Sequence, residues 1–182
     1  MTERVRRMDR PDPPPTVVLA LGNLIRSDDA AGIHALALLE QDPRVPPHVR
    51  FVEGGTKGLE LVSFLSGAVY LLVLDAVDVG APPGTVFRIA TQDLRTLPGS
   101  GNVHELALAD ILNALRLMAQ EPAETVLLGV QPSTTQLGTA LSAPVERALP
   151  ALARAAIAEL QRWDVCNSVS GHAAPEPLFE VT

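Results

Sequence analysis

The sequence predicts an α/β protein, a three-layer α/β/α sandwich built on a mixed five-stranded sheet. Two observations lead to this fold class. Short apolar runs alternate along the chain with longer segments whose apolar residues recur at helical spacing, which is typical of strands and helices in a layered α/β fold. The link VGAPPG, residues 79–84, is too short for a helical crossover between the third and fourth predicted strands. The fourth strand is therefore expected to run antiparallel to the third.

The first predicted strand and helix enclose an acidic loop. Residues 17–21 form a continuous apolar run, as expected for a strand buried on both faces, and a helix is predicted from residue 30 to 40. Between them lie Ser27, Asp28 and Asp29. These three residues are typical helix caps. They also stand where an open parallel sheet binds its ligands, at the carboxyl edge, so both interpretations stay open at this point.

The remaining elements follow from the same patterns. Asp75 ends the third predicted strand, and Thr56 is placed to cap the second helix. Pro144 suits the first turn of the last helix, whereas Pro150 falls inside that helix and predicts a kink or a break. The further strands are predicted at residues 49–53, 69–74, 85–89 and 124–130, and the further helices at 57–65, 104–118 and 142–163.

Length and composition indicate one domain with loose ends. The chain of 182 residues divides into a proline-rich, disordered arm at residues 1–15, a single α/β domain at 16–163 and a flexible tail at 164–182. The formal net charge of −7 argues against nucleic-acid binding, and no apolar run approaches the length of a membrane span. One cysteine excludes a disulfide within the chain. We therefore expect a cytoplasmic monomer.

Three side chains with metal-binding chemistry are predicted to converge. Asp29 follows the first strand, Asp75 ends the third and His104 begins a helix, so all three are expected at the carboxyl edge of the sheet. Two carboxylates and one imidazole suit a divalent metal and leave coordination positions open. The competing interpretations are a turn residue for Asp75 and a structural helix-start residue for His104. The HExxH zinc motif is broken because position 108 is Leu, and no glycine-rich nucleotide fingerprint is present.

Five segments, in order, resemble the nickel–iron (NiFe) hydrogenase maturation endopeptidases. This resemblance implies a phosphorylase/hydrolase-like sandwich and an enzyme that removes a C-terminal extension from the hydrogenase large-subunit precursor after nickel insertion. The segments are GNLIRSDDAAGIHALALLE (22–40), EGGTKGLELV (53–62), LLVLDAVDVGAPPGTV (71–86), HELALADILNALR (104–116) and LLGVQP (127–132).

The resemblance also assigns roles to single residues. It implies that Asp29, Asp75 and His104 contact the metal, with Asp29 a shorter variant of the more usual Glu. Glu53 stands where the family's DGGT motif has Asp, which makes it a secondary catalytic candidate.

The implied mechanism is a hydrolysis in which the nickel belongs to the substrate. We expect no permanently bound metal in this protein, because two carboxylates and one imidazole without a thiolate make a weak site. Glu53 and Asp28 are the candidates for the general base. The alternative function is a non-catalytic nickel-checkpoint or docking module for the precursor. A nucleotide-binding α/β protein is disfavoured by the missing glycine fingerprint.

Overall fold

The computed structural model describes residues 15–90 and 103–170, without the side chains of residues 103–107 and 166–170. Residues 1–14 and 171–182 lie outside the described residues, so the flexibility predicted for them stays a prediction. Within the described residues, the boundaries of the predicted strands differ from the observed ones by at most two residues.

One sheet of five strands forms the centre of the protein, in the order β2-β1-β3-β5-β4. Four strands are parallel, and β4 pairs antiparallel with β5, which confirms the prediction made from the short link between β3 and β4. The strands are β1 (Thr16–Leu21), β2 (Arg50–Gly55), β3 (Tyr70–Ala76), β4 (Val86–Ala90) and β5 (Glu124–Val130).

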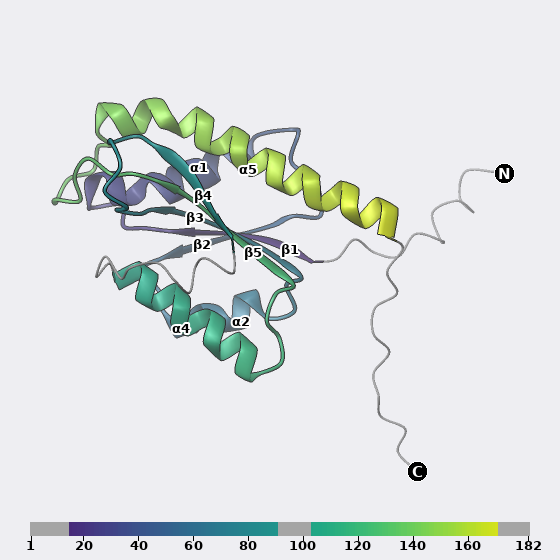
Figure 1. Cartoon of the computed structure of the whole chain (residues 1–182). Coiled ribbons are helices and arrows are strands. Elements are labelled where there is room, and N and C mark those ends of the chain that lie inside the picture. Colours follow the sequence, from purple (N-terminus) through teal and green to yellow (C-terminus); the bar gives the residue numbers. More distant parts are fainter. Residues whose placement is uncertain (1–14, 91–102, 171–182) are drawn as a thin grey trace, which may run out of the picture.

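Helices cover both faces of this sheet, so the predicted three-layer sandwich is confirmed. Figure 1 shows α1 and α5 on one face and α2 and α4 on the other. The helical elements are the 3₁₀ turn η1 (Ser27–Ala30), α1 (Ala31–Glu40), the 3₁₀ turn η2 (Leu59–Leu61), α2 (Val62–Leu65), α4 (Val103–Leu117) and α5 (Ala143–Ser170).

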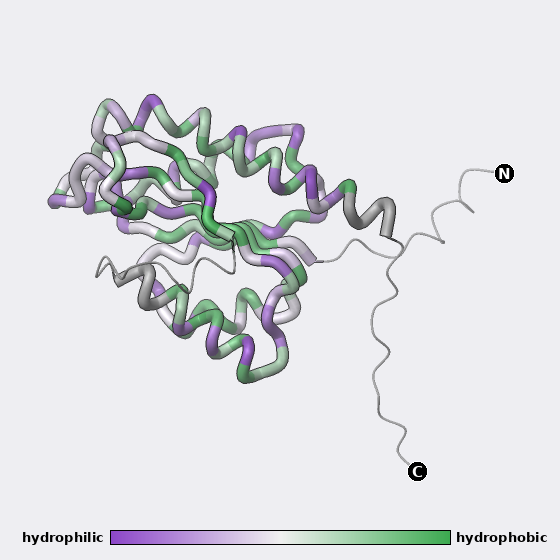
Figure 2. The backbone as a smooth tube through the Cα atoms, in the orientation of Figure 1, coloured by the Kyte–Doolittle hydropathy of each residue, from purple (hydrophilic) through white to green (hydrophobic). Residues whose placement is uncertain are grey.

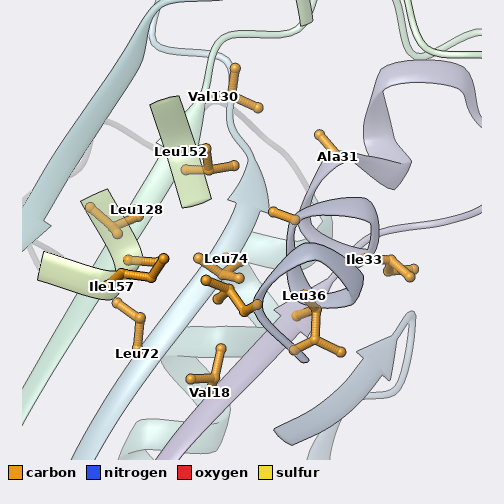
Figure 3. Close-up of a cluster of buried hydrophobic side chains, with 14 of the residues drawn as sticks. Val18, Ala31, Ile33, Leu36, Leu72, Leu74, Leu128, Val130, Leu152 and Ile157 are labelled. Atoms are coloured by element: carbon orange, nitrogen blue, oxygen red, sulfur yellow. The ribbon is translucent and has the colours of Figure 1, made fainter. Parts of the chain in front are cut away.

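The central strands divide their side chains between two hydrophobic clusters. On β3, Leu72 and Leu74 face α1 and α5, whereas Leu71 and Val73 face α2 and α4. All four side chains are fully buried, which is why β1 and β3 read as continuous apolar runs rather than alternating ones. Figure 3 shows the first cluster, and Figure 2 shows the apolar residues gathered along the central strands.

Helix α5 differs from the prediction in two ways. It continues through Pro150 without a break, and it ends at Ser170 rather than near Trp163, so the tail predicted from residue 164 begins with helix. A proline inside a helix costs about 3 kcal/mol. Packing offsets this cost, because Leu152 is fully buried and the Trp163 ring stacks on Tyr70 with 5.1 Å between ring centroids.

The second predicted helix is shorter than expected. Gly58, with φ −99° and ψ −122°, is the residue before η2, and no side chain caps this turn, so Thr56 is not the cap. Because the backbone of Gly58 is not helical, the helical segment begins only at Leu59. Among the residues that the structure describes, no helix has the length and apolar character needed to cross a membrane.

Candidate functional site

The loop after β1 holds Asp29 against the end of the strand. Gly22 has φ +135°, and a Cβ at this position would lie 2.1 Å from the carbonyl oxygen of Asp29. The N–H of Asn23 donates to the same carbonyl at 3.3 Å. The turn η1 therefore folds directly onto the carboxyl end of β1, and Asp29 is only 5% exposed.

A glycine in α1 brings this loop close to β3 as well. A Cβ on Gly32 would lie 2.5 Å from the carbonyl oxygen of Leu21 and 2.4 Å from that of Leu74. The start of α1 thus rests on the ends of two neighbouring strands, and η1 packs against β3. This close packing puts Asp29 beside the strand that carries Asp75.

Asp75 lies near the end of β3 and is only 1% exposed. Its neighbours Leu74 and Ala76 face α1 and α5, so its own side chain faces α2 and α4. One carboxylate oxygen accepts the N–H of Ala76 at 2.8 Å. Asp75 was predicted to end the strand, and it is the last residue but one.

An aromatic ring lies next to Asp75 in the register of the sheet. Asp75 pairs with Gly129 on β5, and Gly129 pairs with Phe87 on β4. A Cβ on Gly129 would lie 2.4 Å from the Phe87 ring, so the ring occupies the space that a side chain would fill. Phe87 belongs to the same hydrophobic cluster as Val73, and the Asp75 carboxylate therefore stands beside an apolar wall.

The backbone places His104 at the same edge and on the same face. Leu108 and Ile111 of α4 belong to the hydrophobic cluster on the face of the sheet toward which Asp75 points. The short link 118–123 joins the end of α4 to the start of β5. Fifteen helical residues span about 22 Å, close to the length of the seven-residue β5. The first turn of α4 therefore lies toward the carboxyl ends of the strands (Figure 1). The His104 side chain is outside the described set.

Glu53 lies further away, on the edge strand β2. It pairs with Ala20 on β1, and Ala20 pairs with Leu74 on β3. Two strand spacings separate Glu53 from β3, about 10 Å. Glu53 is exposed and lines a pocket of about 210 Å³ along β2, together with Phe51, Val52, Lys57, Leu61 and Phe64.

Asp28 has a structural role that the sequence did not suggest. Its carboxylate accepts the N–H groups of Ser133, Thr134 and Ser142 at 2.8, 3.1 and 2.6 Å, and the Ser142 hydroxyl at 2.8 Å. The residue is fully buried. Burial raises the pKa of this carboxyl, but the four donors outweigh burial, so the pKa is lowered overall.

These contacts correct two expectations for the acidic loop. The N-cap residues of η1 and α1 are Arg26 and Ala30, and neither makes a side-chain cap hydrogen bond, so Ser27, Asp28 and Asp29 do not hold the N-cap positions that the capping interpretation gave them. Asp28 is also unsuited to be the general base, because four hydrogen bonds occupy its carboxylate and no water can reach it. The carboxylate instead ties the loop after β1 to the loop after β5.

Gln131 braces a second pair of loops at this edge. Its side-chain oxygen accepts the N–H groups of Val79 and Ala81 at 2.9 and 3.2 Å, and its side-chain nitrogen donates to Asp78 at 2.9 Å. That hydrogen bond, with one from the N–H of Gly80, lowers the pKa of the Asp78 carboxyl. The loops that follow β1, β3 and β5 are therefore cross-linked by buried polar side chains.

Sequence reasoning missed these supporting residues for different reasons. Gly32 carried a signal, because an isolated glycine inside a helical pattern often marks close packing. Asp28 and Gln131 carried none that identifies their partners, which lie up to 114 positions away in the chain. Phe87 and Gly129 become neighbours only through the antiparallel register of β4 and β5.

The site is thus an acidic edge with apolar surroundings. Asp29 and Asp75 place two buried carboxylates on adjacent elements at this edge. Among the side chains that the structure describes, no group of three or more His, Cys, Asp or Glu is arranged to hold a metal. His104, the third predicted ligand, does not belong to that set, so the metal triad stays a prediction.

Comparisons with known proteins agree with this fold. The sequence model of the hydrogenase maturation protease family (HycI) matches residues 33–159. The chain is 33% identical to the hydrogenase expression/formation protein HoxM of Azotobacter vinelandii, over 91% of this chain and 83% of that protein. It is also 33% identical to the hydrogenase 2 maturation protease of Escherichia coli K12, over 75% of this chain and 85% of that protein.

A solved structure shows the same arrangement. The hydrogenase maturating endopeptidase HybD of Escherichia coli superposes with a TM-score of 0.76 at 29% sequence identity. The match covers 81% of this chain and 93% of that one.

Proposed function

The chain belongs to the hydrogenase maturation protease family, and from this premise we propose that it removes the C-terminal extension of a nickel–iron hydrogenase large-subunit precursor after nickel insertion. One observation carries the proposal beyond the family assignment. Two buried aspartates, Asp29 and Asp75, are held at the carboxyl edge of the sheet by adjacent elements that pack tightly through Gly32. Open parallel sheets bind their ligands at this edge, so the position of the two carboxylates supports a role in catalysis.

In this proposal the nickel is part of the substrate. Asp29, Asp75 and His104 contact it and so hold the precursor with its cleavable segment across the edge of the sheet. The metal supplies polarisation of the scissile carbonyl or activation of a water. The placement of the first turn of α4 at the carboxyl edge, on the face toward which Asp75 points, supports this assignment for His104.

Glu53 is the remaining candidate for the general base. Its carboxylate is exposed on β2, whereas that of Asp28 is occupied by four donors. Glu53 lies about two strands away from Asp75, and its register partners Ala20 and Leu74 face α1 and α5, whereas Asp75 faces α2 and α4. A substrate that reaches both residues must therefore pass over the end of β1, from one face of the sheet to the other. The two strand spacings alone take about three residues of an extended peptide.

The test is direct. Purified protein is incubated with nickel-loaded precursor, and the product is weighed by mass spectrometry. Loss of a C-terminal segment is the expected result. A stable complex whose precursor keeps its full mass would contradict the proposal and favour the non-catalytic checkpoint module.

A further inference from the structure

Two loops at the carboxyl edge are joined into one rigid unit. A parallel bridge pairs Arg26 with Gly138. The N–H of Ser27 donates to the Gly138 carbonyl at 2.8 Å, and the N–H of Gly138 donates to the Ile25 carbonyl at 3.1 Å. The residues that precede the two bridge partners, Ile25 and Leu137, are therefore neighbours across the bridge. Ser27 has φ +45°, a conformation that is unfavourable for residues other than glycine and that these bonds hold in place.

The bridged residues present large apolar side chains to water. Ile25 is 58% exposed and Leu137 is 84% exposed, and the adjacent Leu24 is 47% exposed. A scattered apolar residue on a surface needs no explanation. Here, however, apolar residues from two distant segments are brought together by backbone hydrogen bonds. The buried Asp28 carboxylate ties the same two loops once more. We call Leu24, Ile25 and Leu137 the apolar platform.

We propose that the apolar platform binds an apolar segment of the hydrogenase precursor next to the bond that is cut. This inference rests on the proposed function. The platform and the proposed active site share one short connection, because Leu24, Ile25 and Asp29 all lie between the end of β1 and the start of α1. The rigidity of the platform favours binding, since no loop has to be ordered when the partner docks.

The experiment replaces the two bridged side chains. The variants Ile25→Ser, Leu137→Ser and their combination are compared with the wild type in cleavage of nickel-loaded precursor, followed by mass spectrometry. Leu117→Ser is the matched control, because Leu117 is 89% exposed and lies at the end of α4 that leads to the start of β5. We expect the double variant to raise KM by at least about tenfold, with kcat within about twofold of the wild type, as for the loss of apolar contacts at a docking interface. Leu117→Ser should leave both constants unchanged.

The outcomes are separable. If the double variant cleaves the precursor with an unchanged KM, the docking role of the platform is overturned and the proposed function stands. An equal rise in KM for Leu117→Ser would have the same meaning. A wild-type protein that does not cleave the precursor overturns the proposed function, and this inference with it. A wild-type dimer in sedimentation velocity that the double variant loses would identify the platform as a contact between two copies of this chain, which would also overturn the inference. Melting temperatures near that of the wild type are expected for all variants, because the replaced side chains are exposed.

Discussion

The carboxylate of Asp28 accepts hydrogen bonds from both the backbone N–H and the hydroxyl of Ser142, a residue 114 positions further along the chain. The same carboxylate accepts two further N–H groups from the loop after β5. One buried side chain thus joins the loop that carries Asp29 to the segment that leads into α5. The geometry of the proposed site depends on this contact, although Asp28 itself has no chemical role in the proposal.

Replacing this carboxylate should destabilise the fold. In Asp28→Asn one oxygen becomes an N–H₂ group that faces N–H donors, so buried donors lose their acceptor. We expect a loss of about 3 kcal/mol in the free energy of unfolding, measured by urea denaturation at pH 7. The control is Asp42→Asn, where the carboxylate accepts hydrogen bonds from the neighbouring Arg44 at the surface and the change should be small. Equal effects in the two variants would contradict this account.

The same residue should contribute to acid sensitivity. The pKa of the Asp28 carboxyl is lower in the folded protein than in the unfolded chain, where it is about 3.9. Its stabilising contribution is therefore fully present above the unfolded pKa and is lost as the pH falls through the folded pKa. Urea denaturation between pH 5 and pH 2.5 should show a steeper loss of stability in the wild type than in Asp28→Asn. Parallel curves for the two proteins would exclude Asp28 as the origin.

Gly32→Ala tests the close contact between α1 and the sheet. In an ordinary helix this substitution stabilises by about 0.5–1 kcal/mol. Here the new Cβ would lie within 2.5 Å of the Leu21 and Leu74 carbonyl oxygens, so α1 has to shift. We expect a net loss of about 1–3 kcal/mol in unfolding experiments, together with reduced cleavage because Asp29 moves with the helix. The sign of the change in the free energy of unfolding serves as the internal control. A Gly32→Ala variant more stable than the wild type would contradict the close contact between α1 and the sheet.

His104→Ala should abolish cleavage and leave the fold intact. The core face of α4 is supplied by Leu108, Ile111 and Leu115, which are all buried and all remain in this variant. The expected result is a wild-type circular dichroism spectrum and melting temperature with no product in the mass spectrum. Asp110→Ala, an exposed position on the same helix, should cleave normally. Full cleavage by His104→Ala would remove this residue from the mechanism.

Cleavage should depend on nickel in the precursor and not on metal in this protein. The three predicted ligands, Asp29, Asp75 and His104, include no thiolate, whereas structural metal sites usually have four protein ligands. A crossed assay compares chelator-treated and untreated enzyme with nickel-loaded and empty precursor. We expect loaded precursor to be cut by both enzyme samples and empty precursor by neither. Cleavage of empty precursor, or stoichiometric zinc in the purified enzyme, would mean that the protein is an ordinary metalloprotease.

The sequence alone determined the layered fold and the strand that runs antiparallel. Both follow from local patterns, because apolar runs, helical spacing and the short VGAPPG link depend on neighbouring residues only. The edge at which Asp29 and Asp75 lie was also predictable, since parallel strands end on the same side of a sheet. The resemblance to known maturation endopeptidases supplied the family, which the comparisons confirm.

The tertiary structure alone decided what supports the acidic edge. Asp28 was equally suited by sequence to cap a helix or to act as a base, and its four donors come from residues more than one hundred positions away. The uninterrupted passage of α5 through Pro150 likewise reflects packing on the sheet rather than helix propensity. In both cases the deciding free energy comes from contacts between segments distant in the chain, and a local pattern carries no information about those contacts.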